Sequence, residues 1–286
     1  MALAHAADAL SQAGIDTPRL DAQLLLVWTL KCRREDLVRE PERVLSDREQ
    51  LIYDKAISLR MQRRPLPYIT GEAWFYGRPF KINRAVLIPR PETEMLVEAA
   101  REICRVENAP ILADIGTGSG CLAVTLASEL PTAQVCATDL SADALKLARK
   151  NVVRYALEER VTLLRGDLLA PLPPELRCAV IVSNPPYITE AEINGLQPEV
   201  RDYEPSLALS GEEEATGLDG TTLHRRLLSE SPAYLKAGGW LLLEVGMGQA
   251  ETVAEAARDA GYTKVAIRED LAGIGRVVIS QWTQQS

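Results

Sequence analysis

The stretch Val180 to Ile188, which reads Val-Ile-Val-Ser-Asn-Pro-Pro-Tyr-Ile, contains the residues best suited to chemistry. The apolar run Ala179 to Val182 predicts a buried strand. That strand must end at Asn184, because Pro185 and Pro186 have no backbone N–H to donate to a neighbouring strand. Each proline also restricts the residue before it to extended backbone. We therefore expect a rigid polar corner at the carboxyl end of a strand, where open α/β sheets bind their ligands.

Hydrogen-bond acceptors at this corner suit a planar NH₂ group. Asn184 offers a side-chain carbonyl, and the rigid turn can direct the backbone carbonyl of Pro185 outward. Two converging acceptors fit a carboxamide or the exocyclic amine of a base, and Tyr187 supplies a flat aromatic face. Such nitrogens are poor nucleophiles because the lone pair is delocalised. Holding both hydrogens favours lone-pair density toward an electrophile. An ordinary proline-rich turn is the alternative for an isolated motif of this kind.

Composition and charge narrow the classes of function. The chain has 286 residues, a net charge of -8 and a pI near 5.1. An acidic balance argues against a dedicated, sequence-independent nucleic-acid binder. The sequence contains no apolar stretch of the ~20 residues that a membrane span needs, and we expect no signal peptide.

The cysteines are too scattered to predict a metal site, and the histidines are too few to predict His-based catalysis. No Cys-x-x-Cys spacing occurs, so we expect reduced thiols in a cytosolic protein and no metal site. The two histidines, His5 and His224, are interpreted as ordinary surface or helix residues. The five cysteines are Cys32, Cys104, Cys121, Cys136 and Cys178.

Residues 1–64 predict a small helical domain. The first helix runs from Ala2 to Ala13, Thr17-Pro18 caps and starts the second, and Ser46 with Glu49 forms a capping box for the third. The basic run Arg60 to Arg64 is interpreted as a solvated helix end, in preference to a contact with an acidic partner.

Residues 65–84 predict a β-hairpin linker, and residues 85–286 a second domain. The linker has three strand-like runs: Tyr68 to Thr70, Ala73 to Tyr76 and Phe80 to Ile82. Strands and helices then alternate, which predicts an α/β fold with a mostly parallel, doubly wound sheet and an antiparallel last strand or hairpin. The expected strands of this sheet are 111–115, 135–138, 161–164, 179–182, 240–245, 264–267 and 276–280.

A glycine-rich loop follows the first of these strands. Asp114 to Gly120 reads Asp-Ile-Gly-Thr-Gly-Ser-Gly, and glycines there allow a tight turn and close approach of a ligand to the backbone. Asp139 ends the next strand, where a carboxylate can accept hydrogen bonds from a ribose diol. The spacing departs from Gly-x-Gly-x-x-Gly and leaves both NAD and S-adenosylmethionine open, with a bare turn as the third reading.

Asp167 and Leu168 follow the third strand, where an adenine ring would end. Asp167 could meet the exocyclic amine and Leu168 could contact the ring, although Asp167 could equally cap a turn. A sulfonium cofactor carries an electrophilic methyl group and needs neither a metal nor a histidine, only orientation and electrostatic alignment.

Several stretches together resemble the HemK-type peptide chain release factor glutamine methyltransferases, the PrmC family. Besides Asp114 to Gly120 and Asn184 to Tyr187, the resemblance rests on Ile88 to Glu94, on Val200 to Pro205 and on Asp270 to Gly273 with Arg276 to Val278. With the helical domain and the hairpin, it covers essentially the whole chain. Asn-Pro-Pro-Tyr alone is shared with DNA adenine methyltransferases.

The resemblance implies a Rossmann-like class I methyltransferase sheet that uses S-adenosylmethionine and releases S-adenosylhomocysteine. Its substrate would be the glutamine of the Gly-Gly-Gln loop in bacterial class I release factors. We expect a cytoplasmic monomer without direct nucleic-acid contact, whose N-terminal domain helps to hold the release factor. The expected catalytic residues are Asn184, Pro185 and Tyr187, and the substrate site adds Pro186. The expected cofactor contacts are Gly116, Thr117, Gly118, Ser119, Gly120, Asp139, Asp167, Leu168 and Asn184.

Some positions and alternatives remain open. The family often has an aromatic residue where Leu168 stands, so adenine packing is expected to be weaker here. Arg90 and Glu92 could shape the entrance or cap a helix, and Tyr203 and Glu204 could form a lid or a surface loop. A DNA adenine-N6 methyltransferase shares the corner, but the charge of -9 over residues 65–286 opposes it. A nucleotide-binding or redox module explains the glycines and leaves Asn-Pro-Pro-Tyr without a purpose.

Overall fold

The computed structural model describes residues 2–211 and 219–283, which form two compact units. The helical unit comprises Met1–Glu72 together with Gln197–Tyr203, and the sheet unit comprises Ala73–Leu196 and Glu204–Ser286. A short segment from the second half of the sequence thus belongs to the helical unit, which no sequence pattern predicted. The domain boundaries at residues 64 and 84 stay a prediction.

The helical unit is built on amphipathic helices around an apolar core. Leu10, Leu25, Tyr53 and Ile57 are buried at its centre. The predicted capping box is present: Ser46 Oγ accepts from the backbone N–H of Glu49, and Ser46 N–H donates to Glu49 Oε2 over 2.9 Å. The helices are α1 (Ala2–Gln12), α2 (Pro18–Leu30), α3 (Arg34–Arg39), α4 (Asp47–Met61), α5 (Leu66–Thr70) and α10 (Pro198–Arg201).

Of two local predictions for this unit, one is confirmed in position and the other is wrong. Thr17 is the N-cap of α2 with Pro18 as the first helical residue, but its side chain makes no cap hydrogen bond, and its hydroxyl donates to Asp21 over 2.8 Å. Tyr68 to Thr70, predicted as strand, lies in α5. Pro67 in the first turn and Gly71 at the C-cap, with φ of 77°, favour this short helix over the β propensity of its other residues.

The basic end of α4 is paired, so its interpretation as a solvated helix end is also wrong. Arg60 Nε donates to Asp21 over 2.6 Å, and its Nη1 donates to Glu199 over 2.9 Å. Arg63 Nη2 donates to the other oxygen of Glu199 over 2.7 Å. The acidic partner of these arginines is therefore the returning segment of the same chain.

The predicted hairpin is present as β1 (Glu72–Phe75) and β2 (Arg78–Lys81). Its second strand is held on α8 (Ala142–Arg154). Asn151 accepts from Lys81 N–H over 2.8 Å and donates to Lys81 C=O over 3.1 Å. The ring of Phe80 packs on that of Tyr155, with centroids 5.4 Å apart. These contacts fix β2 firmly to the sheet unit.

The main sheet has seven strands in the order β5-β4-β3-β6-β7-β9-β8. The first five are parallel, and β9 is antiparallel to both β7 and β8, which confirms the predicted sheet. The strands are β3 (Ile111–Ile115), β4 (Gln134–Asp139), β5 (Val161–Arg165), β6 (Cys178–Ser183), β7 (Leu235–Glu244), β8 (Thr263–Glu269) and β9 (Gly275–Gln281).

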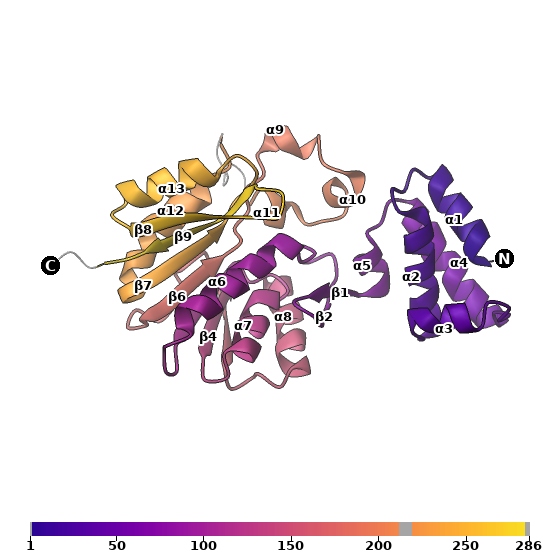
Figure 1. The fold of residues 1–286 in the computed structure, drawn as a ribbon, viewed down its shortest axis with the longest axis horizontal. Helices are drawn as coiled ribbons and strands as arrows, with labels where there is room; N and C mark the ends of the chain where they lie inside the picture. The colour runs from indigo at the N-terminus through magenta and orange to yellow at the C-terminus, as the bar shows by residue number, and fades with distance from the viewer. Residues whose placement is uncertain (1, 212–218, 284–286) are drawn as a thin grey trace. The chain divides into compact units, whose positions relative to one another are not determined.

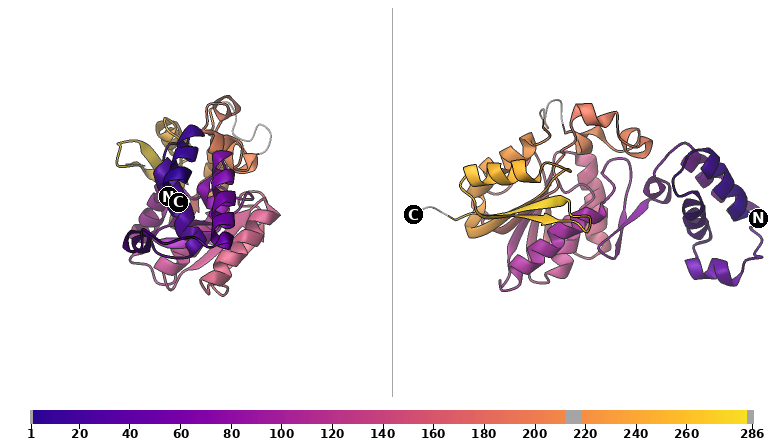
Figure 2. Two further views of the ribbon diagram at one scale, coloured as in Figure 1. Left: turned by 90° about the vertical axis from the view of Figure 1, so that its right-hand side faces the viewer. Right: turned by 45° about the horizontal axis from the view of Figure 1, so that its top comes forward.

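Helices cover both faces of this sheet (Figures 1 and 2). Every residue of β6 is buried, as expected for a central parallel strand. Ile181 of β6 packs with Leu227 and Val253 in the core beneath α12 (Thr222–Glu230) and α13 (Ala250–Asp259). Besides these and α8, the helices and short turns of the unit are η1 (Pro91–Thr93), α6 (Glu94–Cys104), α7 (Cys121–Glu129), α9 (Glu190–Ile193), α11 (Ser206–Leu209) and η2 (Ser231–Ala233).

Strand register brings the predicted site residues to one edge of the sheet. Ile115 of β3 pairs with Thr138 of β4 on one side and with Ser183 of β6 on the other. The glycine loop, Asp139 and Asn184 directly follow these three positions, so all three lie at the carboxyl edge. Among residues 2–211 and 219–283, no helix is both long and apolar enough to cross a membrane.

Candidate functional site

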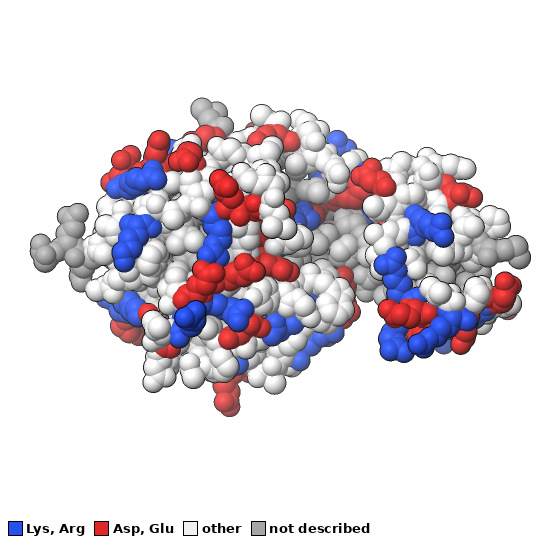
Figure 3. Space-filling view, in the orientation of Figure 1, with Lys and Arg blue, Asp and Glu red and all other residues white. Residues whose placement is uncertain are grey.

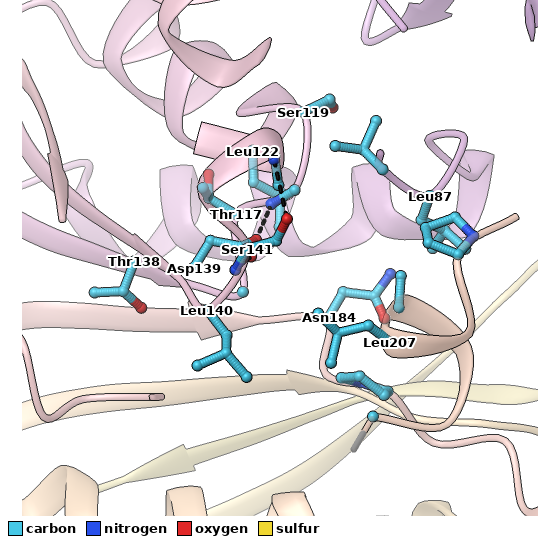
Figure 4. A pocket seen from close by; sticks show the side chains of 18 of the residues that line it. Leu87, Thr117, Ser119, Leu122, Thr138, Asp139, Leu140, Ser141, Asn184 and Leu207 are labelled. Carbon is cyan, nitrogen blue, oxygen red and sulfur yellow. Dashed lines mark hydrogen bonds between the residues drawn. The ribbon is translucent and has the colours of Figure 1, made fainter. Parts of the chain in front are cut away.

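A cavity of about 360 Å³ opens at the carboxyl edge of the sheet (Figure 4). The loops after β3, β4, β5 and β6 contribute to it, as do the segment before α6 and the start of α11. Its lining is more apolar than polar. The residues that line it are Ala85, Val86, Leu87, Pro89, Arg90, Thr93, Gly116, Thr117, Gly118, Ser119, Cys121, Leu122, Thr138, Asp139, Leu140, Ser141, Asp143, Ala144, Gly166, Asp167, Leu168, Asn184, Pro186, Pro205, Leu207, Ala208, Gly211, Leu223 and Arg226.

The glycine loop presents backbone to the cavity. Gly116 and Gly118 have positive φ values of 76° and 54°, and a Cβ added at either would meet no atom within 4 Å. The loop is held to β4, because the N–H groups of Gly116 and Thr117 both donate to Thr138 C=O over 2.9 Å. A ligand can therefore approach the loop backbone closely at these two glycines.

Two carboxyl groups flank this loop. Asp139 accepts from Gly118 N–H and from Ser141 N–H, each over 2.8 Å, and burial raises its pKa. Asp114 is completely buried, and burial raises its pKa to about 7 against the lowering effect of Thr117, whose hydroxyl donates to it over 2.6 Å. Among the residues that the structure describes, Asp114 Oδ1 has no hydrogen-bond partner. Asp114 itself does not line the cavity.

Asp167 and Leu168, which were predicted as cofactor contacts, also line the cavity. Leu168 adopts a left-handed backbone with φ of 42°, and its carbonyl accepts from the Thr138 hydroxyl over 2.9 Å. Asp167 accepts from Arg226 Nη2 over 2.7 Å, with both side chains about half exposed. Arg226 was not predicted, because nothing in its sequence context marks it as a cavity residue.

Asn184 lies in the cavity wall directly after β6. Its Nδ2 donates to Thr93 Oγ1 over 3.2 Å, and within residues 2–211 and 219–283 no group donates to its Oδ1. Figure 4 shows Thr117, Asp139 and Ser141 grouped on one side, and Asn184 with Leu207 on the other. The structure therefore brings the glycine loop, Asp139 and Asn184 to one cavity.

Three of the predicted site residues do not line this cavity. Gly120 is the N-cap of α7, with φ of 78°, and a Cβ there would lie 3.1 Å from Ala148 Cβ. Pro185 is buried. Tyr187 is half-buried, and its carbonyl accepts from Gln249 Nε2 over 3.1 Å. Burial raises the pKa of its phenol, which is therefore neutral.

Part of the cavity wall comes from the segment that follows the helical unit's returning residues. Glu204 is 6% exposed and accepts from Arg90 Nη2 over 2.7 Å and from Ile88 N–H over 3.3 Å. Burial raises the pKa of Glu204, against the lowering effect of Arg90. This ion pair connects the stretch before α6 to the wall residues after position 204. Arg90 is also the N-cap residue of η1, but its side chain makes no cap hydrogen bond there.

The remaining positions whose roles the sequence left open lie in different parts of the structure. Tyr203 belongs to the helical unit, where its hydroxyl donates to Gln62 C=O. Glu92 is half-buried in η1. His224 is a helix residue as expected, yet it is fully buried, and burial lowers its pKa to about 4. The described residues contain no cluster of three or more His, Cys, Asp or Glu placed to hold a metal ion.

Sequence comparison shows what this chain resembles. Residues 1–71 match the family model of the PrmC N-terminal domain, and residues 92–197 match that of the methyltransferase small domain. A release factor glutamine methyltransferase of Koribacter versatilis is 44% identical over 95% of this chain and 94% of that protein. One from Geobacter sulfurreducens is 41% identical over 94% of this chain and 91% of that protein.

Solved structures share the fold. A methyltransferase from Pyrococcus furiosus covers 82% of this chain and 96% of its own, with a TM-score of 0.53 at 18% identity. The N-terminal domain of human METTL16 in complex with SAH covers 84% of each chain, with a TM-score of 0.52 at 18% identity. These likenesses agree with a methyltransferase sheet in the sheet unit.

Proposed function

This chain belongs to the release factor glutamine methyltransferases, and we propose that it methylates the side-chain amide nitrogen of the glutamine in the Gly-Gly-Gln motif of class I release factors. The methyl donor is S-adenosylmethionine, and S-adenosylhomocysteine is released. The observation that carries the proposal is Asn184, whose free carbonyl end lies in the same cavity as the glycine loop.

The cavity fits the cofactor. The open backbone at Gly116 and Gly118 accepts close contact, and Thr117 and Ser119 line the same loop. We assign the ribose hydroxyls to the Asp139 carboxylate and the adenine to the end of the cavity formed by Asp167 and Leu168. Asp114 does not line the cavity; its carboxyl group supports the loop by accepting from Thr117 Oγ1 over 2.6 Å and from Ala123 N–H over 3.0 Å. Gly120 acts indirectly, by allowing α7 to begin close to α8.

Bound S-adenosylmethionine supplies an electrophilic methyl carbon. The task of the protein is to orient the amide nitrogen. Asn184 Oδ1 accepts one N–H of the glutamine amide, and the backbone carbonyl of Pro185 accepts the other. With both hydrogens held, the nitrogen cannot rotate, and its lone pair is directed at the donor.

The two prolines and the tyrosine complete the corner. Pro185 and Pro186 keep the turn after β6 rigid, so the two acceptors stay in place without reorganisation. The neutral ring of Tyr187 offers an apolar face for the planar amide. Its carbonyl contact with Gln249 anchors it to the start of α13.

Asn184→Ala tests this assignment. We expect it to retain S-adenosylmethionine binding within about tenfold by calorimetry, and to lower methyl transfer to a release factor by at least about a hundredfold. The same assay with duplex DNA separates the protein substrate from an adenine substrate. Wild-type transfer to DNA in preference to the release factor, or full activity of Asn184→Ala, would contradict the proposal.

We further propose that the enzyme acts as a cytoplasmic monomer without a nucleic-acid partner. The net charge of -8 supports the last point, since phosphate backbones attract cationic surfaces. On the face shown in Figure 3, Lys and Arg side chains are interspersed with Asp and Glu.

A further inference from the structure

Asn184 carries an amide with two different ends, and only one of them suits the glutamine. The proposed function needs the carbonyl end at the substrate, because the glutamine nitrogen offers two donors. A reversed amide would present N–H groups to N–H groups. Asn184 must therefore be held in one of two orientations that have nearly the same shape.

Thr93 contacts the other end of this amide. Its Oγ1 lies 3.2 Å from Asn184 Nδ2. Thr93 is only 4% exposed and occupies the N-cap position of α6, yet its side chain makes no cap hydrogen bond there. The hydroxyl of Thr93 is thus available for a purpose other than capping the helix.

Glu244 is the second neighbour of Thr93. It is the last residue of β7, is 2% exposed and shares a side-chain hydrogen bond with Thr93. Among the described residues, its Oε2 has no hydrogen-bond partner. The side chains of Glu244, Thr93 and Asn184 therefore form a chain that begins at β7 with two buried residues and ends in the cavity at half-buried Asn184.

The direction of the hydrogen bonds in this chain follows from proton counting. A carboxylate can only accept, so the single proton of the Thr93 hydroxyl points to Glu244. The Thr93 oxygen then has only lone pairs to offer to Asn184. Asn184 must turn its NH₂ group toward Thr93, and its carbonyl is left facing the cavity.

We infer that Thr93 and Glu244 are positioning residues, which fix the orientation of the Asn184 amide so that its carbonyl faces the glutamine. This inference rests on the proposed function. It adds two residues that act through Asn184, and it explains a buried carboxylate at the end of β7.

Two threonine variants and one control test the inference in kinetics. Thr93→Val keeps the shape and removes the hydroxyl, Thr93→Ser keeps the hydroxyl, and Thr125→Val removes the hydroxyl of a fully buried threonine that has no hydrogen-bond partner among the described residues. We expect Thr93→Val to lower kcat for release factor methylation about 10- to 100-fold, with KM within about threefold. Thr93→Ser and Thr125→Val should stay within about threefold of wild type. Unchanged kcat in Thr93→Val, or equal loss in Thr93→Ser, would overturn the inference.

Glu244→Gln gives a second kinetic arm should Thr93→Val fold poorly. The amide of the new glutamine can donate to the Thr93 oxygen, so the Thr93 hydroxyl is no longer forced to point its proton at residue 244. We expect about a tenfold loss in kcat. Wild-type kcat in Glu244→Gln would count against the inference.

A spectroscopic arm separates this inference from the proposed function, because it needs no substrate. In ¹⁵N-labelled protein, the side-chain NH₂ signals of Asn184 are assigned by their loss in Asn184→Asp. We expect Thr93→Val to shift these signals and Thr125→Val to leave them unchanged. Unshifted signals in Thr93→Val refute the positioning role, whereas absence of release factor methylation by wild type refutes only the proposed function.

Discussion

Two buried carboxyl groups of the sheet unit have pKa values close to neutrality. Burial raises the pKa of Asp114 to about 7 and that of Glu244 to about 7, each against a hydrogen bond that lowers it, from Thr117 and Thr93 respectively. Sequence patterns gave no reason to single out Glu244 or Thr93, since a strand-final Glu and a helix-initial Thr are common. Burial and the hydrogen-bond partners of the two residues had to be seen in three dimensions.

The ionisation of Glu244 predicts a pH dependence of catalysis. Only the carboxylate form of Glu244 forces the Thr93 hydroxyl to donate its proton to it. Because the pKa of Glu244 is about 7, the fraction in the carboxylate form grows as the pH rises through neutrality. At saturating cofactor and release factor, kcat should therefore rise with pH and level off above about pH 8. The charged or titratable groups that act on Glu244 are Glu92, Arg276 and Arg90, with Tyr187 as a neutral phenol.

The pH profiles of two variants distinguish titration of Glu244 from titration of other groups. Glu244→Gln cannot titrate and should flatten the profile, whereas Asp114→Asn, measured at saturating cofactor, should keep the inflection. An inflection near pH 7 that persists in Glu244→Gln would assign the titration to another group.

At the scale of elements, the loops at the carboxyl edge depend on strand register. The pattern of short apolar runs predicted β3, β4 and β6, and their pairing places the glycine loop, Asp139 and Asn184 together. The capping box of Ser46 and Glu49 in the helical unit was equally visible in the sequence. The helix α5 was not, because its aromatic and β-branched residues favour strand, and only its Pro and Gly ends decide for helix.

Two glycines of one loop should respond differently to alanine. Gly116→Ala meets no neighbouring atom, so the left-handed backbone alone should lower the free energy of unfolding, by about 1–2 kcal/mol. Its methyl group would fill the space assigned to the cofactor, and we expect at least a tenfold loss of S-adenosylmethionine affinity by calorimetry. Unchanged affinity would remove Gly116 from the cofactor site.

Gly120→Ala adds a packing conflict to the same backbone strain. The new Cβ would lie 3.1 Å from Ala148 Cβ and 3.3 Å from its Cα, which belong to a rigid helix. We expect a larger loss of unfolding free energy than in Gly116→Ala, about 2–4 kcal/mol by denaturant titration. A smaller loss than that of Gly116→Ala would contradict the close-approach role of Gly120.

At the scale of the whole molecule, the chain leaves the sheet unit after Leu196 and re-enters it at Glu204. Between these points, Glu199 joins the buried arginine Arg60 and its neighbour Arg63 in the helical unit. Arg60 and Glu199 are 139 residues apart in sequence, so periodicity and local composition could not predict the pairing. The part of the cavity wall after Glu204 could not be predicted either, because Glu204 and its partner Arg90 are 114 residues apart in sequence.

Removal of this charge should loosen the returning segment. In Glu199→Gln, Arg60 keeps Asp21, but both arginines lose a charged partner, and we expect faster amide exchange within Gln197–Tyr203 by hydrogen–deuterium exchange. Glu190→Gln changes an exposed glutamate of α9, outside the returning segment; it is the control and should change nothing beyond its own turn. Equal exchange in wild type and Glu199→Gln would show that this ion pair does not hold the segment.

The most direct test of the account identifies the methylated atom. A class I release factor is incubated with S-adenosylmethionine and either wild type or Asn184→Ala, digested, and sequenced by tandem mass spectrometry. The account predicts one methyl group on the side chain of the Gly-Gly-Gln glutamine with wild type, and almost none with Asn184→Ala. A methyl group on another residue, or equal methylation of the glutamine by Asn184→Ala, would contradict it.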